Sequence, residues 1–194
     1  ASVEAMADWV FAFLKALKIE KAMLAGHSMG SLIALDFAAR HAQAVEKIAL
    51  IATAYPMKVS EGFLDAARRN DQAAYDMETI WGHAAQVPLA GNPNPGMWMY
   101  GDTLARLSRL APGVLHTDLA SCNSYAGGMD AAAKVKCPAL FVLGARDMMT
   151  PPRGAEALID KIENSQSVRI ASSGHSLMAE APDAPLDALI GFLS

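Results

Sequence analysis

Three residues of types that together activate a nucleophile occur in the order serine, aspartate, histidine. Ser28 stands between Gly26 and Gly30 in a Gly-x-Ser-x-Gly pattern, and Asp147 and His175 follow later in the chain. A serine hydroxyl becomes a good nucleophile when a neighbouring imidazole removes its proton, and a carboxylate fixes the tautomer of that imidazole. Ser28, Asp147 and His175 are therefore the predicted catalytic residues of an acyl-transfer reaction.

The glycines around Ser28 indicate how this serine would be presented. Gly26 and Gly30 are the predicted structural-turn residues, because they allow a sharp bend between a strand and a helix without Cβ clashes. At the head of that helix the backbone N–H of Met29 could donate to a developing oxyanion. The alternative is an ordinary surface turn, since the pattern arises by chance in a chain of this length with a probability of about 0.06.

Each of the other candidates also has a purely structural interpretation. Asp147 could cap a helix that is expected to begin at residue 151, and His175 could be a histidine in a turn. His27 is expected to be a packing or pocket-wall residue, because its position directs it away from the Ser28 side chain. Asp147 is the single acid in the loop at 144–147, which favours the catalytic interpretation.

Short apolar runs alternate with amphipathic segments along the chain. Strands are expected at 21–26, 45–54, 137–144 and 167–171, and helices at 2–19, 31–42, 151–164 and 184–193. The first helix would have Ser2 as its N-cap and one apolar face, formed by Met6, Trp9, Val10, Phe13, Leu14 and Leu17. This alternation predicts an α/β fold, with a mostly parallel sheet and helices on both faces. The three candidate catalytic residues would follow three different strands, at the edge where functional groups collect.

The stretch at 57–134 differs in composition from its flanks and is expected to be a helical cap inserted between strands. It carries turn signals at 91–96 and 125–129, and the core would comprise residues 1–56 and 135–194. The candidates for lining a substrate pocket are His27, Trp81, Trp98, Met148 and Leu177. Most apolar residues of the stretch could instead be ordinary cap core. Arg106, Arg109 and Arg146 could bind a substrate carboxylate or be solvated surface.

Composition and charge exclude several classes of protein. The 194 residues are 53% hydrophobic and 19% charged, with a net charge of −4 and no basic patch, so no nucleic-acid partner is expected. No apolar run approaches the roughly 18 residues of a membrane span, so no membrane partner is expected. Cys122 and Cys137 belong to no Cys-x-x-Cys or His/Cys cluster. We expect no metal, no cofactor and a cytoplasmic location.

The segments AGHSMGS, LGARDMMTPP and SSGHSLMAEAP resemble, in order, the nucleophile, acid and histidine segments of the α/β-hydrolase superfamily. The resemblance implies an esterase-like serine hydrolase that cleaves a small, largely apolar ester or related carbonyl compound through an acyl-enzyme. Lipases, C–C bond hydrolases, cofactor-free perhydrolases, acyltransferases, aminopeptidases and hydroxynitrile lyases of the same superfamily stay open. Haloalkane dehalogenases and typical epoxide hydrolases are disfavoured, because they use an aspartate in place of this serine.

The chain resembles the C-terminal two-thirds of that superfamily, in which several strands usually precede the nucleophile strand. Those strands and the second oxyanion donor are expected to be absent here, so the isolated chain is expected to be poorly active. The alternative function is then a non-catalytic fragment or interaction module. The strand near residues 22–26 would form an open edge, and we expect it to promote self-association.

Overall fold

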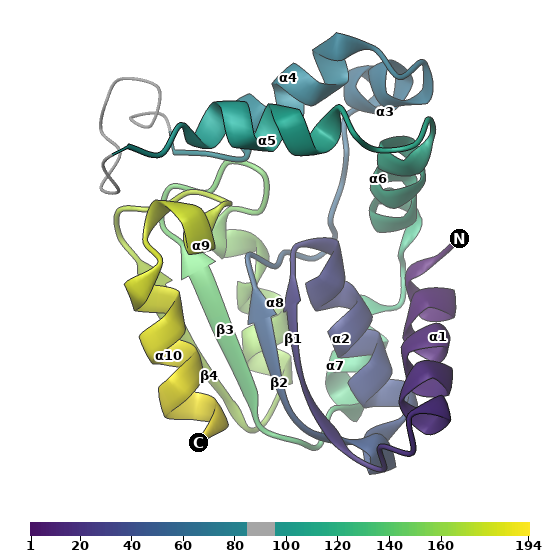
Figure 1. Cartoon of the computed structure of the whole chain (residues 1–194). Coiled ribbons are helices and arrows are strands. Elements are labelled where there is room, and N and C mark those ends of the chain that lie inside the picture. The colour runs from purple at the N-terminus through teal and green to yellow at the C-terminus, as the bar shows by residue number, and fades with distance from the viewer. Residues whose placement is uncertain (85–95) are drawn as a thin grey trace.

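The computed structural model describes residues 1–84 and 96–194, so most of the turn expected at 91–96 lies outside the described residues. Within them, four parallel strands form one sheet in the order β1, β2, β3, β4. The strands are β1 (Ala22–His27), β2 (Val45–Ile51), β3 (Ala139–Gly144) and β4 (Ser165–Ile170). The predicted α/β fold with a parallel sheet is confirmed (Figure 1).

Helices cover both faces of this sheet, as predicted. One side holds α1 (Val3–Ala16), α2 (Met29–Arg40), α7 (Gly128–Lys134) and α8 (Glu156–Lys161), and the other holds α9 (Leu177–Glu180) and α10 (Asp183–Leu193) (Figure 1). Strand side chains alternate between the two cores, so Ile48 packs on the α2 side and Ala49 on the α10 side. None of the helices within 1–84 and 96–194 is long and apolar enough to cross a membrane.

Several element ends differ from the expectations because local turns interrupt the sequence patterns. The second strand ends at Ile51 instead of residue 54, since Ala52 adopts a φ of +49°. The helix expected at 151–164 is divided into a 3-10 turn, Pro152–Gly154, and the shorter α8. Prolines fix the backbone at the start of this segment but do not supply the hydrogen bonds of a continuous helix.

The buried face of α1 includes only part of the apolar stripe that its spacing predicted. Ser2 caps the helix as predicted, since its hydroxyl accepts from Ala5 N–H. The buried residues are Val3, Ala7 and Leu14, whereas Trp9, Phe13 and Leu17 stay 65%, 47% and 54% exposed. Val10 and Leu14 of the predicted stripe, together with Phe11, pack in the core beside α2.

A layer of helices lies over the C-terminal edge of the sheet, between β2 and β3 in the chain (Figure 1). It consists of α3 (Glu61–Arg68), α4 (Gln72–Trp81), α5 (Met99–Leu107) and α6 (Val114–Ser124). Phe63 and Ala74 belong to a small buried cluster of this α3–α6 layer, separate from the cores beside the sheet. By contrast α7 packs in the core against α2. The division into 1–56, 57–134 and 135–194 stays a prediction.

β1 is an edge strand in the part of the chain that the structure describes. Its hydrogen-bonded partner there is β2, through a register that pairs Leu24 with Ile48 and His27 with Ile51. Met23 on this strand is 42% exposed. Exposed apolar edges can pair with another chain, so self-association through residues 22–26 stays a prediction.

Candidate active site

Ser28 occupies a strained bend between β1 and α2. Its φ of +53° and ψ of −119° are values that residues other than glycine rarely adopt. The bend is held from two sides: Ser28 N–H donates to the Ile51 carbonyl (2.9 Å), and Ser31 Oγ donates to the Ser28 carbonyl (2.6 Å). Met29 is the first residue of α2, so its N–H has no acceptor within the helix and stays available beside the serine.

The chain in this bend packs backbone against backbone at Gly26. A Cβ at Gly26 would lie 2.0 Å from the Gly30 carbonyl oxygen and 2.7 Å from Ser31 N. A Cβ at Gly30 would meet no atom within 4 Å. The steric need for glycine therefore concerns Gly26, while Gly30 supplies the backbone that Gly26 contacts.

We expect Gly26→Ala to destabilise the protein by about 3 kcal/mol or more, because a Cβ that overlaps backbone cannot escape by changing rotamer. The free energy of unfolding, measured by urea titration and circular dichroism, would report the loss. Gly30→Ala is the matched control, since the same methyl group there enters open space. Equal unfolding midpoints for the two variants would contradict the tight bend.

Asp147 and His175 form a buried pair at the ends of β3 and β4. Asp147 Oδ2 lies 2.8 Å from His175 Nδ1, and both residues are 4% exposed. The other carboxylate oxygen, Oδ1, accepts from the backbone N–H groups of Met149 (2.9 Å) and Thr150 (2.8 Å). Asp147 thus holds its own loop with one oxygen and the imidazole with the other. It does not cap α8, whose N-cap residue is Ala155.

These contacts set the protonation of Asp147. Burial opposes its ionisation, but hydrogen bonds from His175 and Thr150 outweigh burial and hold the pKa of this carboxyl below its usual value. A carboxylate can only accept hydrogen bonds, so His175 Nδ1 carries a proton. His175 Nε2 is then free to act as a proton acceptor. With its proton on Nδ1, His175 can act as a general base through Nε2.

His27 joins the bend to the histidine loop. Its Nε2–H donates to the His175 carbonyl (2.8 Å), and the two imidazole rings lie 4.7 Å apart between centroids. Burial, followed by the nearby His175, lowers the pKa of His27 to about 4, so His27 is neutral near pH 7. None of the hydrogen bonds within the described residues joins Ser28 Oγ to His175 Nε2. Such bonds are often long in unliganded sites and shorten when a substrate binds.

Two residues that support the histidine were missed in the sequence. Thr150 Oγ1 lies 2.6 Å from Asp147 Oδ2 and 3.0 Å from His175 Nδ1. Glu180 is 2% exposed, and its Oε2 accepts from the N–H groups of Gly174 and Ala84, both at 3.0 Å. Glu180 thereby links the histidine loop to the segment that follows α4. An acid inside the apolar run at 177–181 was the available signal for this role.

The bend opens into a cavity of about 630 Å³ that the α3–α6 layer helps to enclose. Its lining is mainly apolar, with contributions from Met29, Met57, Phe63, Trp81, Leu115, Leu119, Met148 and Met149. Of the predicted pocket residues, His27, Trp81 and Met148 line this cavity together with Ser28. Within the described residues, no group of three or more His, Cys, Asp or Glu could hold a metal ion.

Trp98 and Leu177, the other two predicted pocket residues, do not line this cavity. Trp98 precedes α5, is 77% exposed and lies against Gly101, where a Cβ would be 2.0 Å from the indole ring. Leu177 is fully buried in the core between the sheet and α10. It follows His175 by two residues, but the start of α9 turns its side chain into that core.

A parallel sheet with a strained serine bend after one strand, and a paired aspartate and histidine after two others, defines the α/β-hydrolase class of enzymes. Comparison with known protein families specifies this further. The family model described as serine aminopeptidase, S33, matches residues 2–182, and the chain belongs to this family.

Individual relatives agree with this classification. The chain is 31% identical over 189 residues to the AB hydrolase superfamily protein YisY of Bacillus subtilis, covering 91% of this chain and 68% of YisY. It is 27% identical over 197 residues to the pimeloyl-[acyl-carrier protein] methyl ester esterase of Neisseria meningitidis serogroup A, covering 90% of this chain and 56% of the esterase. The solved structure of a thermophilic esterase superposes with a TM-score of 0.83 at 25% identity, covering 100% of this chain and 73% of that one.

Proposed function

We propose that this chain carries the nucleophile, base and acid of a serine hydrolase that cleaves small, largely apolar esters. The observation that carries the proposal is the buried Asp147–His175 pair, 2.8 Å apart, beside the strained bend that exposes Ser28 to an apolar cavity. The esterases among the relatives support the same reaction class.

The reaction follows from the roles that these groups can take. Ser28 Oγ attacks the ester carbonyl while His175 Nε2 takes the hydroxyl proton. Asp147 stabilises the resulting imidazolium, and the Met29 N–H donates to the oxyanion. His175 then gives its proton to the leaving alcohol, which produces an acyl-Ser28. A water molecule activated by His175 attacks this ester, releases the acid and restores Ser28.

The α3–α6 layer would act as the cap expected at 57–134. It supplies Phe63 and Trp81, and with the methionines near the bend it surrounds the space above Ser28. Flexible methionine side chains adapt to ligands of different shape, so an apolar acyl chain or a small aromatic group is the expected substrate portion.

Reaction with a fluorophosphonate probe and hydrolysis of p-nitrophenyl butyrate test this function. An activated serine forms a stable covalent adduct with the probe, so we expect stoichiometric labelling of Ser28, located by peptide mass spectrometry, together with measurable ester turnover. Folded protein that neither reacts with the probe nor hydrolyses the ester would overturn the proposal and favour the non-catalytic alternative. Labelling without turnover of any ester in a panel would direct attention to perhydrolase, lyase or C–C hydrolase chemistry.

A further inference from the structure

Two carboxyl groups line the mainly apolar cavity above Ser28. Glu78 belongs to α4 and Asp118 to α6, so both are residues of the α3–α6 layer. The carboxyls therefore share one cavity with the Ser28 nucleophile.

Within the described residues, one oxygen of the Glu78 carboxyl receives no hydrogen bond. Its Oε2 is shielded from solvent and has no hydrogen-bond partner within the described residues. No ion pair of residues 1–84 and 96–194 includes Glu78 or Asp118. Lys58 lines the same cavity, but its Nζ donates to the Asn123 carbonyl (3.0 Å). Burial raises the pKa of both acids, and for Glu78 the nearby His175 opposes part of this rise.

Aromatic rings accompany these carboxyls. Trp81 and Phe63 line the cavity and meet edge to face, with centroids 5.6 Å apart. The face of an aromatic ring attracts a cation, most strongly in tryptophan and when water is excluded. Carboxyls and aromatic rings around one apolar space are the combination that recognises ammonium groups.

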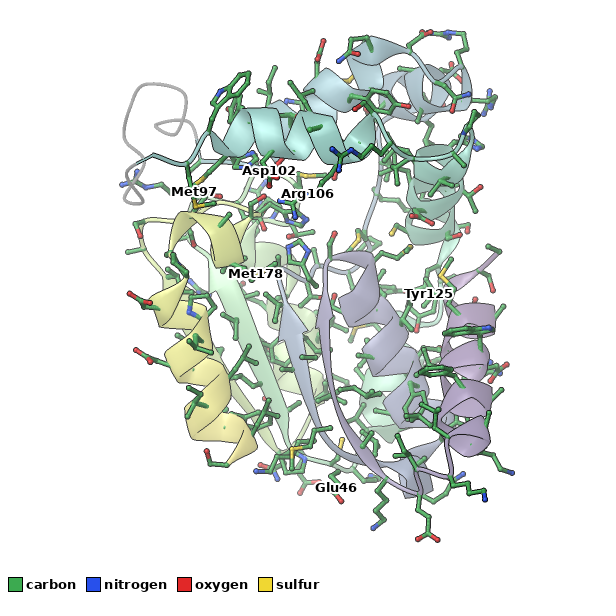
Figure 2. All side chains as sticks on the ribbon, viewed as in Figure 1. Glu46, Met97, Asp102, Arg106, Tyr125 and Met178 are labelled. Carbon is green, nitrogen blue, oxygen red and sulfur yellow. The ribbon has the colours of Figure 1, made fainter. Side chains whose placement is uncertain are left out.

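The arginines give no comparable site for an anionic substrate. Arg106 forms an ion pair with Asp102, and Figure 2 shows both residues on the side of α5 that faces Met178. Arg109 and Arg146 are exposed. None of these arginines lines the cavity above Ser28. Arg106 instead lines a neighbouring cavity that His27 and Glu78 also border, where it pairs with Asp102.

We propose that Glu78, with Asp118, Trp81 and Phe63, forms a subsite for an ammonium group, so that the preferred substrate is a cationic ester. The inference rests on the proposed hydrolase function, since the ammonium group would orient the ester carbonyl toward Ser28. It names the chemical class of substrate, an apolar acyl chain that ends in a positive charge, and leaves the reaction itself unchanged.

Two p-nitrophenyl esters of nearly equal shape provide the test: 4-(trimethylammonio)butanoate and its uncharged isostere 5,5-dimethylhexanoate. The ratio of their kcat/KM values, each corrected for spontaneous hydrolysis, is expected to favour the cation by about tenfold or more. Glu78→Gln should reduce this preference by about fivefold or more, and Asp118→Asn by a smaller factor. Activity on the uncharged ester should persist in both variants.

Asp76→Asn is the matched control, because Asp76 lies on the same helix, is exposed and does not line the cavity. It makes the same change in net charge and should leave the cation preference unaltered. An equal preference in wild type and Glu78→Gln, or a loss of preference in Asp76→Asn as large as in Glu78→Gln, would overturn the subsite. Circular dichroism of each variant verifies that it folds.

A binding measurement separates failure of the subsite from failure of the proposed function. Isothermal titration of Ser28→Ala with the two corresponding amides is expected to show tighter binding of the trimethylammonium compound, and Glu78→Gln in that background should remove the difference. Turnover of the uncharged ester without selective ammonium binding would reject the subsite alone. Selective binding without any turnover would support the subsite and reject the hydrolase function.

Discussion

Ser28→Ala is expected to reduce kcat for p-nitrophenyl butyrate by about 10⁴-fold or more, since removing the nucleophile of a serine hydrolase leaves only the contributions of binding and oxyanion stabilisation. The Asp147–His175 pair does not involve the Ser28 side chain and should stay intact. Stopped assays at high protein concentration, combined with loss of fluorophosphonate labelling, would measure the effect.

Ser108→Ala is a suitable control for this substitution. Ser108 is exposed at the end of α5, where its hydroxyl donates to the Ala105 carbonyl, and it does not line the cavity. The control should keep wild-type kcat and full labelling. If Ser28→Ala retained more than about a tenth of the activity, Ser28 would not be the nucleophile and the proposed reaction would fail.

Asp147→Asn is expected to reduce kcat by about 10⁴-fold while leaving the fold largely intact. The asparagine oxygen can still accept from the Met149 and Thr150 N–H groups, so the loop keeps its shape. Its amide nitrogen, however, donates toward His175 Nδ1 and favours the tautomer that has a proton on Nε2. That tautomer cannot take the proton from Ser28. Steady-state kinetics and the unfolding midpoint together distinguish this loss of basicity from loss of structure.

Asp160→Asn makes the same chemical change on the exposed side of α8 and should leave kcat unaltered. The predicted contrast is between a large effect at Asp147 and none at Asp160, with similar unfolding midpoints. A small effect at Asp147 would show that another group orients His175. Thr150 would then be the first candidate, because its hydroxyl lies 3.0 Å from His175 Nδ1.

The strand-end positions of Ser28, Asp147 and His175 could be predicted because their signals are local. Each follows a short apolar run, and the Gly26 contact that shapes the serine bend spans only four residues. The parallel sheet follows similarly from the alternation of strands and helices. The buried face of α1 could be predicted only in part, since Trp9 and Phe13 are as apolar as Val10 and Leu14, which pack in the core. The periodicity of apolar residues predicts a helix, but it does not indicate which element packs against each of its faces.

The sequence by itself therefore determined the class of fold, the serine bend and the order of the three candidate catalytic residues. Only the tertiary structure decided which side chains surround them. Glu78 and Asp118 lie on helices that the sequence separates widely from Ser28, and Glu180 meets Ala84 across a similar gap. Trp98 and Leu177, by contrast, do not line the cavity. Trp98 is exposed just before α5, and Leu177 is buried in the core beside α10. Such contacts depend on how packed helices rotate and approach one another, and residue type or spacing along the chain does not specify that geometry.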